Sequence, residues 1–225
     1  MDTPPTSRPD ETADRLSRTD SARRVERPTT IAGDDGRRRC AWSGDDAEYQ
    51  RYHDEEWGRP LRSDRELFEK ISLEGFQAGL SWITILRRRE AFRTAFLGFD
   101  PEAVARMGDE DVVRLMGDSA IIRNRRKIEA TITNARAVIA LDEPLSSVVW
   151  RFAPAAGTRP RPRSWSEVPA TSAESTALSA ELKARGFRFV GPTTMYALMQ
   201  SGGLVDDHVV GCWRADETDA GSAGP

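Results

Sequence analysis

Hydrophobic residues recur at helical spacing along most of the chain beyond residue 39. The clearest helix start is Ser63-Asp64-Arg65-Glu66, which has the spacing of a capping box and is followed by Leu67, Phe68 and Ile71. Asp100-Pro101-Glu102 is a second start, because proline is favoured at the first helical position. Further helical segments are predicted over 81–96, after a cap at Asp109, over 125–141, 145–152 and 173–185, from Pro192 to about Gly202, and for one turn over 208–212. No alternating run of strand length is present, so the fold class is predicted to be all-α.

The first 38 residues differ from this pattern. They contain almost no large apolar residue, so they cannot bury enough surface to offset the entropy lost on ordering. We therefore predict a disordered tail over 1–38, one helical domain over 39–214 and a disordered tail over 215–225. Three arginines over 37–39 suit either contact with a polyanion or a solvated tail, and the solvated tail is the simpler interpretation.

The composition excludes several classes of protein. The chain has 225 residues and no apolar run of about 18 residues, so a membrane-spanning helix is not expected. No apolar segment follows Met1, and two cysteines are too few for a secreted disulfide scaffold, so a cytoplasmic location is expected. The net charge of −3 argues against a protein that holds nucleic acid by bulk positive charge. A monomer is expected at this size.

All cysteines and histidines of the chain fall into two pairs, one near each end of the predicted domain. The pairs are Cys40 with His53 and His208 with Cys212. Two thiolates and two imidazoles suit a tetrahedral zinc ion, and four protein ligands leave no position for water, so such a zinc would be structural. It would join the two ends of the domain. The alternatives are residues without a metal and a Cys40–Cys212 disulfide, which a cytosolic location disfavours.

One carboxylate lies on an apolar helix face. Glu74 shares a face with Leu67, Ile71 and Ala78, and burying an unpaired carboxylate is costly. Six tryptophans are present, and several of them lie beside polar residues in this part of the chain: Trp42, Trp57 and Trp82, together with Tyr52. One interpretation is an aromatic pocket with a single acceptor for a flat, cationic or hydrogen-bond-donating ligand. The alternative is a core in which Glu74 pairs with an arginine.

A glycine-bounded turn joins two of the predicted helices. Gly186 and Gly191 flank Phe-Arg-Phe-Val, and Pro192-Thr193 follows. The N–H groups of Gly191 and Thr193 would lie at a helix N-terminus, which can bind an anion such as a DNA phosphate. Many helix pairs are joined by such turns for packing reasons alone.

Several sequence blocks in order resemble the DNA-3-methyladenine glycosylase I family of the helix–hairpin–helix glycosylases. The resemblance runs from Arg39 to about Arg214 and leaves both termini outside. The blocks are Cys40-Ala-Trp42, Tyr52-His-Asp-Glu-Glu-Trp-Gly58, Leu73-Glu-Gly-Phe-Gln-Ala-Gly-Leu-Ser-Trp82, Ile121-Ile-Arg-Asn-Arg-Arg-Lys-Ile128, Gly186-Phe-Arg-Phe-Val-Gly-Pro192 and Asp207-His-Val-Val-Gly-Cys212.

The resemblance implies a role for each group of candidate residues. Glu74 and Tyr52 would be the catalytic residues of the base pocket, Trp82 would stack on the base, and Trp42 and Trp57 would line the pocket. The turn residues Gly186, Gly191 and Thr193 would bind a DNA phosphate. Cys40, His53, His208 and Cys212 would hold one structural Zn²⁺ per chain.

The resemblance also implies an activity, the hydrolytic excision of 3-methyladenine from alkylated double-stranded DNA. A base methylated at N3 is cationic and leaves as a neutral base, so little acid catalysis is needed and base selection dominates. A lyase step needs an amine in the pocket, and none of Lys70, Lys127 and Lys183 lies in a pocket block, which favours a monofunctional hydrolase. Asp206 stands where some relatives in the wider superfamily carry a catalytic aspartate, and a capping role is the simpler interpretation.

Two other functions remain open. The first is a non-catalytic protein that binds alkylated DNA or a nucleobase, although the presence of Glu74, Tyr52 and Trp82 together favours the enzyme. The second is a hydrolase whose metal is catalytic, which would require an open ligand position.

Overall fold

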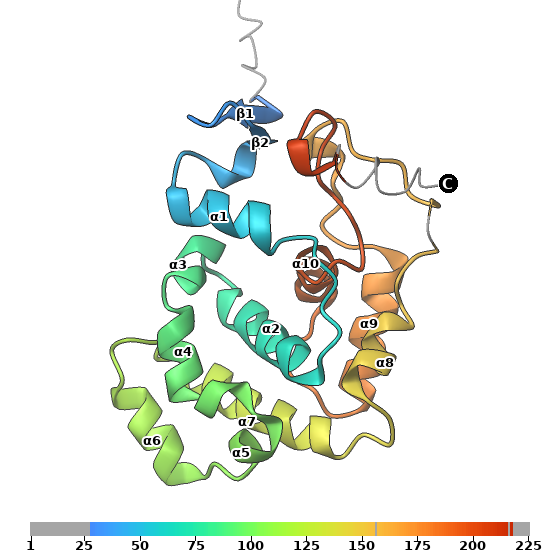
Figure 1. The fold of residues 1–225 in the computed structure, drawn as a ribbon. Coiled ribbons are helices and arrows are strands. Elements are labelled where there is room, and N and C mark those ends of the chain that lie inside the picture. The colour runs from blue at the N-terminus through green and yellow to red at the C-terminus, as the bar shows by residue number, and fades with distance from the viewer. Residues whose placement is uncertain (1–27, 156, 216, 218–225) are drawn as a thin grey trace, which may run out of the picture.

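The computed structural model describes residues 28–155, 157–215 and 217, and in this part the chain is mostly helical, as predicted. A small β-hairpin precedes the helices (Figure 1). The elements are β1 Thr30–Ala32, β2 Arg38–Cys40, η1 Ala41–Ser43, α1 Ala47–Glu55, α2 Asp64–Gln77, α3 Trp82–Leu86, α4 Arg89–Ala95, η2 Leu97–Phe99, α5 Pro101–Ala105, α6 Asp109–Gly117, α7 Arg125–Ile139, α8 Leu145–Trp150, η3 Trp165–Glu167, α9 Ala173–Ala184 and α10 Pro192–Ser201.

Helix α2 runs through the middle of the molecule and packs against α3, α7, α8 and α10 (Figure 1). The predicted N-cap is confirmed, since the Ser63 side chain accepts a hydrogen bond from the Glu66 N–H. Most side chains between Leu67 and Phe76 are buried because other helices cover α2 on several sides. Polar residues in this stretch are therefore forced into the interior, which places Glu74 there.

The single helix predicted over 81–96 is interrupted at three consecutive arginines, Arg87, Arg88 and Arg89. The structure has two helices here, α3 and α4, with a break around Arg88. Arg87 pairs with Asp46, the Arg88 guanidinium donates to the Ala120 carbonyl at 2.8 Å, and Arg89 pairs with Glu56. These three contacts reach different parts of the molecule, and the break allows the side chains to diverge.

The start of α6 also differs from the prediction. The N-cap is Gly108 rather than Asp109, and the Asp111 carboxylate accepts from the Gly108 N–H at 3.1 Å. A carboxylate three residues into a helix often satisfies the N-cap N–H in this way. The cap at Asp100 is confirmed, because its side chain accepts from the Ala103 N–H at 2.9 Å.

The last part of the predicted N-terminal tail is ordered in an antiparallel hairpin. Strand β1 pairs with β2, with Thr30 opposite Cys40. Arg39, expected to be solvated, is 5% exposed and forms ion pairs with Asp35 and Asp54. The prediction was wrong for this residue because the sequence pattern did not show that Asp54, on α1, lies beside it. Residues 1–27 of the predicted tail lie outside the described residues.

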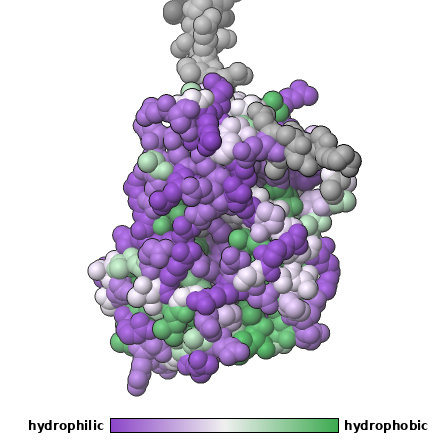
Figure 2. Space-filling model, in the orientation of Figure 1, coloured by the Kyte–Doolittle hydropathy of each residue, from purple (hydrophilic) through white to green (hydrophobic). Residues whose placement is uncertain are grey.

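The two ends of the described chain meet. The C-terminal segment after α10 returns to the hairpin, and Ala215 is buried beside Cys40 and Cys212 (Figure 1). The predicted tail over 215–225 therefore begins with a buried residue, and 216 and 218–225 lie outside the described residues. Hydrophilic residues cover most of the face shown in Figure 2. In the described ranges, no helix is both long and apolar enough to cross a bilayer.

Candidate base pocket and metal cluster

An aromatic cavity of about 150 Å³ lies between α1, α2 and α10. It contains all five residues that the sequence analysis assigned to a base pocket. The lining residues are Trp42, Tyr49, Tyr52, Trp57, Glu74, Gln77, Trp82, Trp165, Ala197, Gln200 and Ser201. They come from several separate stretches of sequence, so only the folded chain assembles the cavity.

The aromatic rings of the pocket contact one another edge to face or at a tilt. The Trp42 and Trp57 ring centroids are 5.0 Å apart, and those of Tyr52 and Trp82 are 5.4 Å apart. The indole N–H groups of Trp42 and Trp82 are buried and have no hydrogen-bond partner among the described residues. Buried donors are nearly always paired in proteins, so their presence in this wall is typical of a site that a ligand completes.

Glu74 is the acidic residue of the pocket and is 4% exposed. The Ser201 hydroxyl donates to its carboxylate at 3.1 Å. Burial raises the pKa of Glu74 to about 7, and this rise is opposed by the charge of Lys70 and by the bond from Ser201. No arginine pairs with Glu74 in the described part of the chain, so the arginine alternative is wrong. The carboxylate is available to a donor in the cavity.

Lys70 lies much closer to the pocket than the sequence blocks indicated. Its ammonium donates to the Tyr52 hydroxyl at 3.4 Å and lies 4.7 Å from the centroid of the Trp82 ring. Lys70 is one helical turn from Glu74 on α2, which brings it into contact with the residues that α1 and α3 contribute. Lys70 thus lies beside the pocket although it is outside the pocket sequence blocks, and it does not line the aromatic cavity itself.

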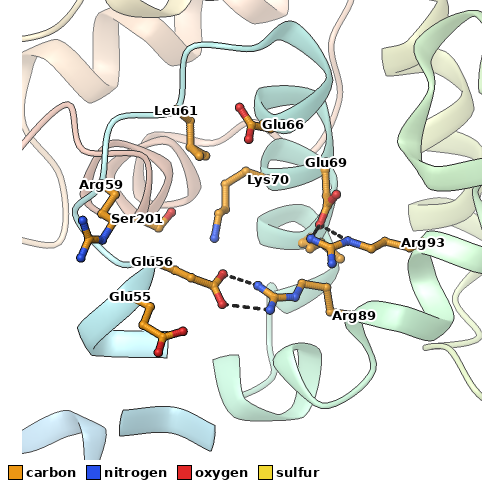
Figure 3. A pocket seen from close by; sticks show the side chains of 11 residues that line it. Glu55, Glu56, Arg59, Leu61, Glu66, Glu69, Lys70, Arg89, Arg93 and Ser201 are labelled. Carbon is orange, nitrogen blue, oxygen red and sulfur yellow. Dashed lines mark hydrogen bonds and ion pairs between the residues drawn. The ribbon is translucent and has the colours of Figure 1, made fainter. Parts of the chain in front are cut away.

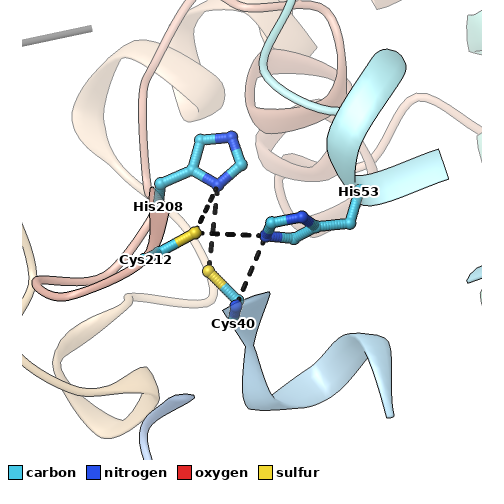
Figure 4. Close-up of side chains that lie close together, drawn as sticks. All are labelled: Cys40, His53, His208 and Cys212. Carbon is cyan, nitrogen blue, oxygen red and sulfur yellow. Dashed lines mark hydrogen bonds between the residues drawn. The ribbon is translucent and has the colours of Figure 1, made fainter. Parts of the chain in front are cut away.

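The four predicted metal ligands form one buried cluster (Figure 4). The ligand atoms of Cys40, His53, His208 and Cys212 all lie within 4.8 Å of one another. The Cys40 thiol donates to the Cys212 sulfur, and this bond, together with burial, raises the pKa of Cys40. The same bond and those from His208 and His53 lower the pKa of Cys212. A cation would allow both sulfurs to be thiolates.

The ring nitrogen of each histidine that faces away from the cluster also lies within hydrogen-bond distance of a protein oxygen. His53 Nδ1 lies 2.8 Å from an Asp54 carboxylate oxygen, and the same carboxylate accepts from Arg39 and from the Trp213 indole. His208 Nε2 lies 3.3 Å from the Trp57 carbonyl. Metal-bound histidines are commonly oriented in this way by a carboxylate or a carbonyl. The donor set and its supports therefore fit a tetrahedral zinc ion.

The segment that carries His208 and Cys212 is a turn, not the helical turn that was predicted. Gly211 in this turn has φ of +81°, a conformation that glycine adopts without strain. The turn directs both side chains at the cluster, where the cysteines are free thiols rather than the alternative disulfide.

The glycine-bounded turn joins α9 to α10, as predicted. Gly186, with φ of +90°, donates its N–H to the Lys183 carbonyl and thereby ends α9. This N–H is therefore occupied within the protein. Gly191 is the N-cap of α10, Pro192 follows at its first position, and Thr193 lies in its first turn.

The sequence analysis missed several residues of the pocket. Tyr49, Gln77, Trp165, Gln200 and Ser201 line it. Tyr49 lies on the same helix as Tyr52, one turn earlier, so a helix prediction over 47–55 would have found it. Trp165 comes from a proline- and arginine-rich segment outside the predicted helices, and no local signal placed it in the pocket.

Asp206 is not part of the pocket lining. Its carboxylate accepts from the His208 N–H at 3.1 Å and pairs with Arg161 at 3.1 Å. Asp206 therefore caps the turn that presents a cluster ligand, in agreement with the capping interpretation.

A helical architecture with an aromatic pocket around one buried acid defines an enzyme of the DNA glycosylase type. Residues 42–215 match the model of the methyladenine glycosylase family, and the chain belongs to this family. Enzymes of this family hydrolyse N-glycosyl bonds.

The chain is 50% identical over 177 residues to DNA-3-methyladenine glycosylase 1 of Escherichia coli (strain K12), a match that covers 77% of this chain and 95% of the relative. It is 48% identical over 180 residues to the DNA-3-methyladenine glycosylase of Haemophilus influenzae, covering 77% and 96%.

Solved structures agree with this assignment. A crystal structure of 3-methyladenine DNA glycosylase I superposes with a TM-score of 0.75 at 47% identity, covering 78% of this chain and 98% of the other. A structure described as the basis of 3-methyladenine recognition by the Staphylococcus aureus enzyme superposes with a TM-score of 0.72 at 35% identity, covering 78% and 95%. The prediction of a helix–hairpin–helix glycosylase fold is confirmed.

Proposed function

We propose that this chain removes 3-methyladenine from alkylated double-stranded DNA by hydrolysing the N-glycosidic bond. The observation that carries the proposal is a buried carboxylate, Glu74, in a cavity walled by aromatic rings. A base carrying a positive charge gains from both, because ring faces attract cations and a carboxylate offsets the charge. The names of the relatives point to the same substrate.

Each pocket residue has a distinct role in this proposal. Glu74 accepts a hydrogen bond from the exocyclic amine of the flipped base, and Tyr52 contributes a hydroxyl hydrogen bond to the neighbouring position. Trp82 stacks on the base, and Trp42 and Trp57 line the pocket. Normal adenine has no positive charge and gains less from the same walls, so selection arises from a difference in affinity.

The chemical step needs little from the protein beyond binding. The bond between the base nitrogen and C1′ of the sugar breaks, and its electron pair neutralises the cationic base. Water then adds to C1′ and releases a proton. A lyase step would need an amine in the base pocket. Lys70 lines a separate neighbouring cavity with mostly charged walls and does not line the base pocket. This supports a monofunctional enzyme.

DNA is proposed to contact the turn between α9 and α10. The N–H groups of Gly191 and Thr193 lie at the start of α10, where a phosphate would be favoured by the helix dipole. Gly186 is proposed to contribute by shaping the turn, since its N–H bonds to Lys183. We further propose a monomeric, cytoplasmic enzyme.

The metal cluster is proposed to hold one structural Zn²⁺ through Cys40, His53, His208 and Cys212. When bound, the ion supplies a crosslink between the hairpin, α1 and the C-terminal turn. Four protein ligands leave no position for water, so the zinc is given no part in the hydrolysis.

The test is chromatographic analysis of the bases released from methylated duplex DNA. The wild type is expected to release free 3-methyladenine, and Glu74→Ala is expected to lose most of this activity. Glu102→Ala is the matched control, because Glu102 is an exposed glutamate on α5, away from the pocket.

Two outcomes would contradict the proposal. A folded wild type that releases no base but still binds methylated DNA would indicate the non-catalytic binding protein. Full activity of Glu74→Ala would remove Glu74 from the mechanism.

A further inference from the structure

A second cavity, of about 270 Å³, adjoins the aromatic pocket, and Figure 3 shows the side chains that line this second cavity. Charged residues dominate its lining, and Ser201 belongs to both cavities. The lining residues are Glu55, Glu56, Arg59, Leu61, Glu66, Glu69, Lys70, Leu73, Arg89, Arg93 and Ser201.

Most of the central charges in this cavity are paired. Arg89 pairs with Glu56, and Arg93 pairs with Glu69 at 2.8 Å. Lys70 is 8% exposed and has no carboxylate within ion-pair distance in the ranges that the structure describes. Its ammonium instead lies at the faces of two pocket rings, 5.0 Å from the Tyr52 centroid and 4.7 Å from the Trp82 centroid. Ring faces attract cations, so both contacts hold the amine in place.

The hydrogen bond from Lys70 determines what the Tyr52 hydroxyl can do. A lysine ammonium only donates, so at 3.4 Å the Tyr52 oxygen is the acceptor. The hydroxyl hydrogen must then point away from Lys70. The Tyr52 hydroxyl bonds to no other described residue, and the Tyr52 side chain lines the aromatic pocket.

Tyr52 and Glu74 consequently present a hydroxyl donor and a carboxylate acceptor to the pocket. Adenine carries an acceptor nitrogen next to an exocyclic amine on its major-groove edge, whereas guanine carries two acceptors there. A Tyr52 donor and the Glu74 acceptor match the first arrangement and not the second.

We propose that Lys70 is a positioning residue that fixes the Tyr52 hydroxyl as a donor and thereby selects an adenine-type edge. The inference rests on the proposed function, because it assumes that the base enters the aromatic pocket.

The experiment measures the affinity of the folded enzyme for free 3-methyladenine by quenching of tryptophan fluorescence. Lys70→Met removes the donor, Lys70→Arg keeps one, Tyr52→Phe removes the hydroxyl, and the Lys70→Met/Tyr52→Phe double variant removes both. We expect Lys70→Met and Tyr52→Phe each to weaken binding by about tenfold, the cost of one lost hydrogen bond, and the double variant to be no weaker than Tyr52→Phe. Lys70→Arg is expected to restore part of the affinity.

A second probe separates positioning from a general structural role. The 7-deaza analogue of 3-methyladenine lacks the acceptor nitrogen, so we expect Lys70→Met and the wild type to bind it equally. The melting temperature of Lys70→Met is expected to be no lower than that of the wild type, because a buried amine without a carboxylate is costly. Should Lys70→Met fail to fold, Lys70→Leu provides the same comparison, because leucine also lacks a donor.

Several results would overturn the inference. They are wild-type affinity in Lys70→Met, additive losses in the double variant, or an equal loss for the 7-deaza analogue. If the wild type neither binds nor releases 3-methyladenine, the proposed function fails, and the inference fails with it. A wild type that excises the base with unchanged affinity in Lys70→Met would refute the inference alone.

Discussion

The burial of Glu74 carries a structural cost, which its proposed role in binding the base would explain. The carboxylate is held in the interior by one hydroxyl bond and by the charge of Lys70, and burial raises its pKa to about 7. Such a group binds a cation more tightly than an exposed acid would, because the surroundings screen the charge less. Perturbed acids of this kind often mark functional sites.

Replacing Glu74 by glutamine should change how stability depends on pH. The pKa of Glu74 is raised from 4.5 to about 7 in the folded chain, so between these values the folded state binds more protons than the unfolded state. The wild type should therefore lose about 3 kcal/mol relative to Glu74→Gln as the pH rises through this window. Urea unfolding of both proteins at a series of pH values measures the difference, in which other titrating groups cancel.

Exposed Glu102→Gln is the matched control and should show no such divergence from the wild type. Parallel pH profiles for Glu74→Gln and the wild type would show that Glu74 titrates normally.

Trp165 is a further residue with a predicted effect. It is 44% exposed at the pocket, with its ring centroid 6.3 Å from that of Trp42 and 6.3 Å from that of Trp57. Trp165→Ala should weaken binding of free 3-methyladenine several-fold, since an aromatic contact contributes about 1 kcal/mol, with little loss of stability. Val113→Ala, at an exposed residue on α6, is the control, and unchanged affinity in Trp165→Ala would exclude a contact with the base.

At the scale of elements, the end of α2 decides where the pocket residues after it are placed. Lys127 on α7 donates to the Phe76 carbonyl at 2.8 Å and to the Ala78 carbonyl at 2.6 Å. A cation is favoured at a helix C-terminus, where the last carbonyls have no helical partner. Lys127 thereby fixes the short connection that leads from Glu74 to Trp82.

Lys127→Met should leave these carbonyls without a donor. We expect a loss of about 1–3 kcal/mol in the free energy of unfolding, together with a weaker affinity for the base as Trp82 becomes less fixed. Denaturant unfolding and fluorescence titration measure the two effects. Exposed Lys183→Met on α9 should change neither, and a stability of Lys127→Met equal to that of the wild type would refute the role.

At the scale of the whole molecule, the metal cluster connects segments far apart in sequence. Cys40 comes from β2, His53 from α1, and the remaining ligands from the turn after α10. A crosslink of this kind restricts the unfolded chain and also fixes α1, which carries Tyr52.

Removal of the metal should therefore destabilise the chain. It should leave the hydrolysis itself unaffected, because the ion is proposed to take no part in the reaction. We expect one zinc per chain in the wild type by elemental analysis, none in Cys212→Ser, and a lower melting temperature for the variant. Activity per folded molecule at low temperature should be largely retained. A folded, metal-free enzyme without activity would instead support a catalytic metal.

The candidate site residues could be predicted from the sequence because the signals that mark them are local. Capping residues, helical spacing and the scarcity of cysteine and histidine are properties of neighbouring or countable residues. They were sufficient to predict most helices, the four cluster residues and the exceptional position of Glu74. The resemblance to a family added the roles of the aromatic residues.

The remaining features depend on contacts between distant segments. The sequence by itself determined which residues carry the chemistry, because residue type and helical periodicity are local. Only the tertiary structure placed Lys70 behind Tyr52, brought Trp165 to the pocket and paired Arg39 with Asp54. It also divided one predicted helix in two and formed a hairpin from part of a predicted tail. Burial and ion pairing between residues far apart in the sequence decided these features. Local propensity does not specify which distant side chains will become neighbours.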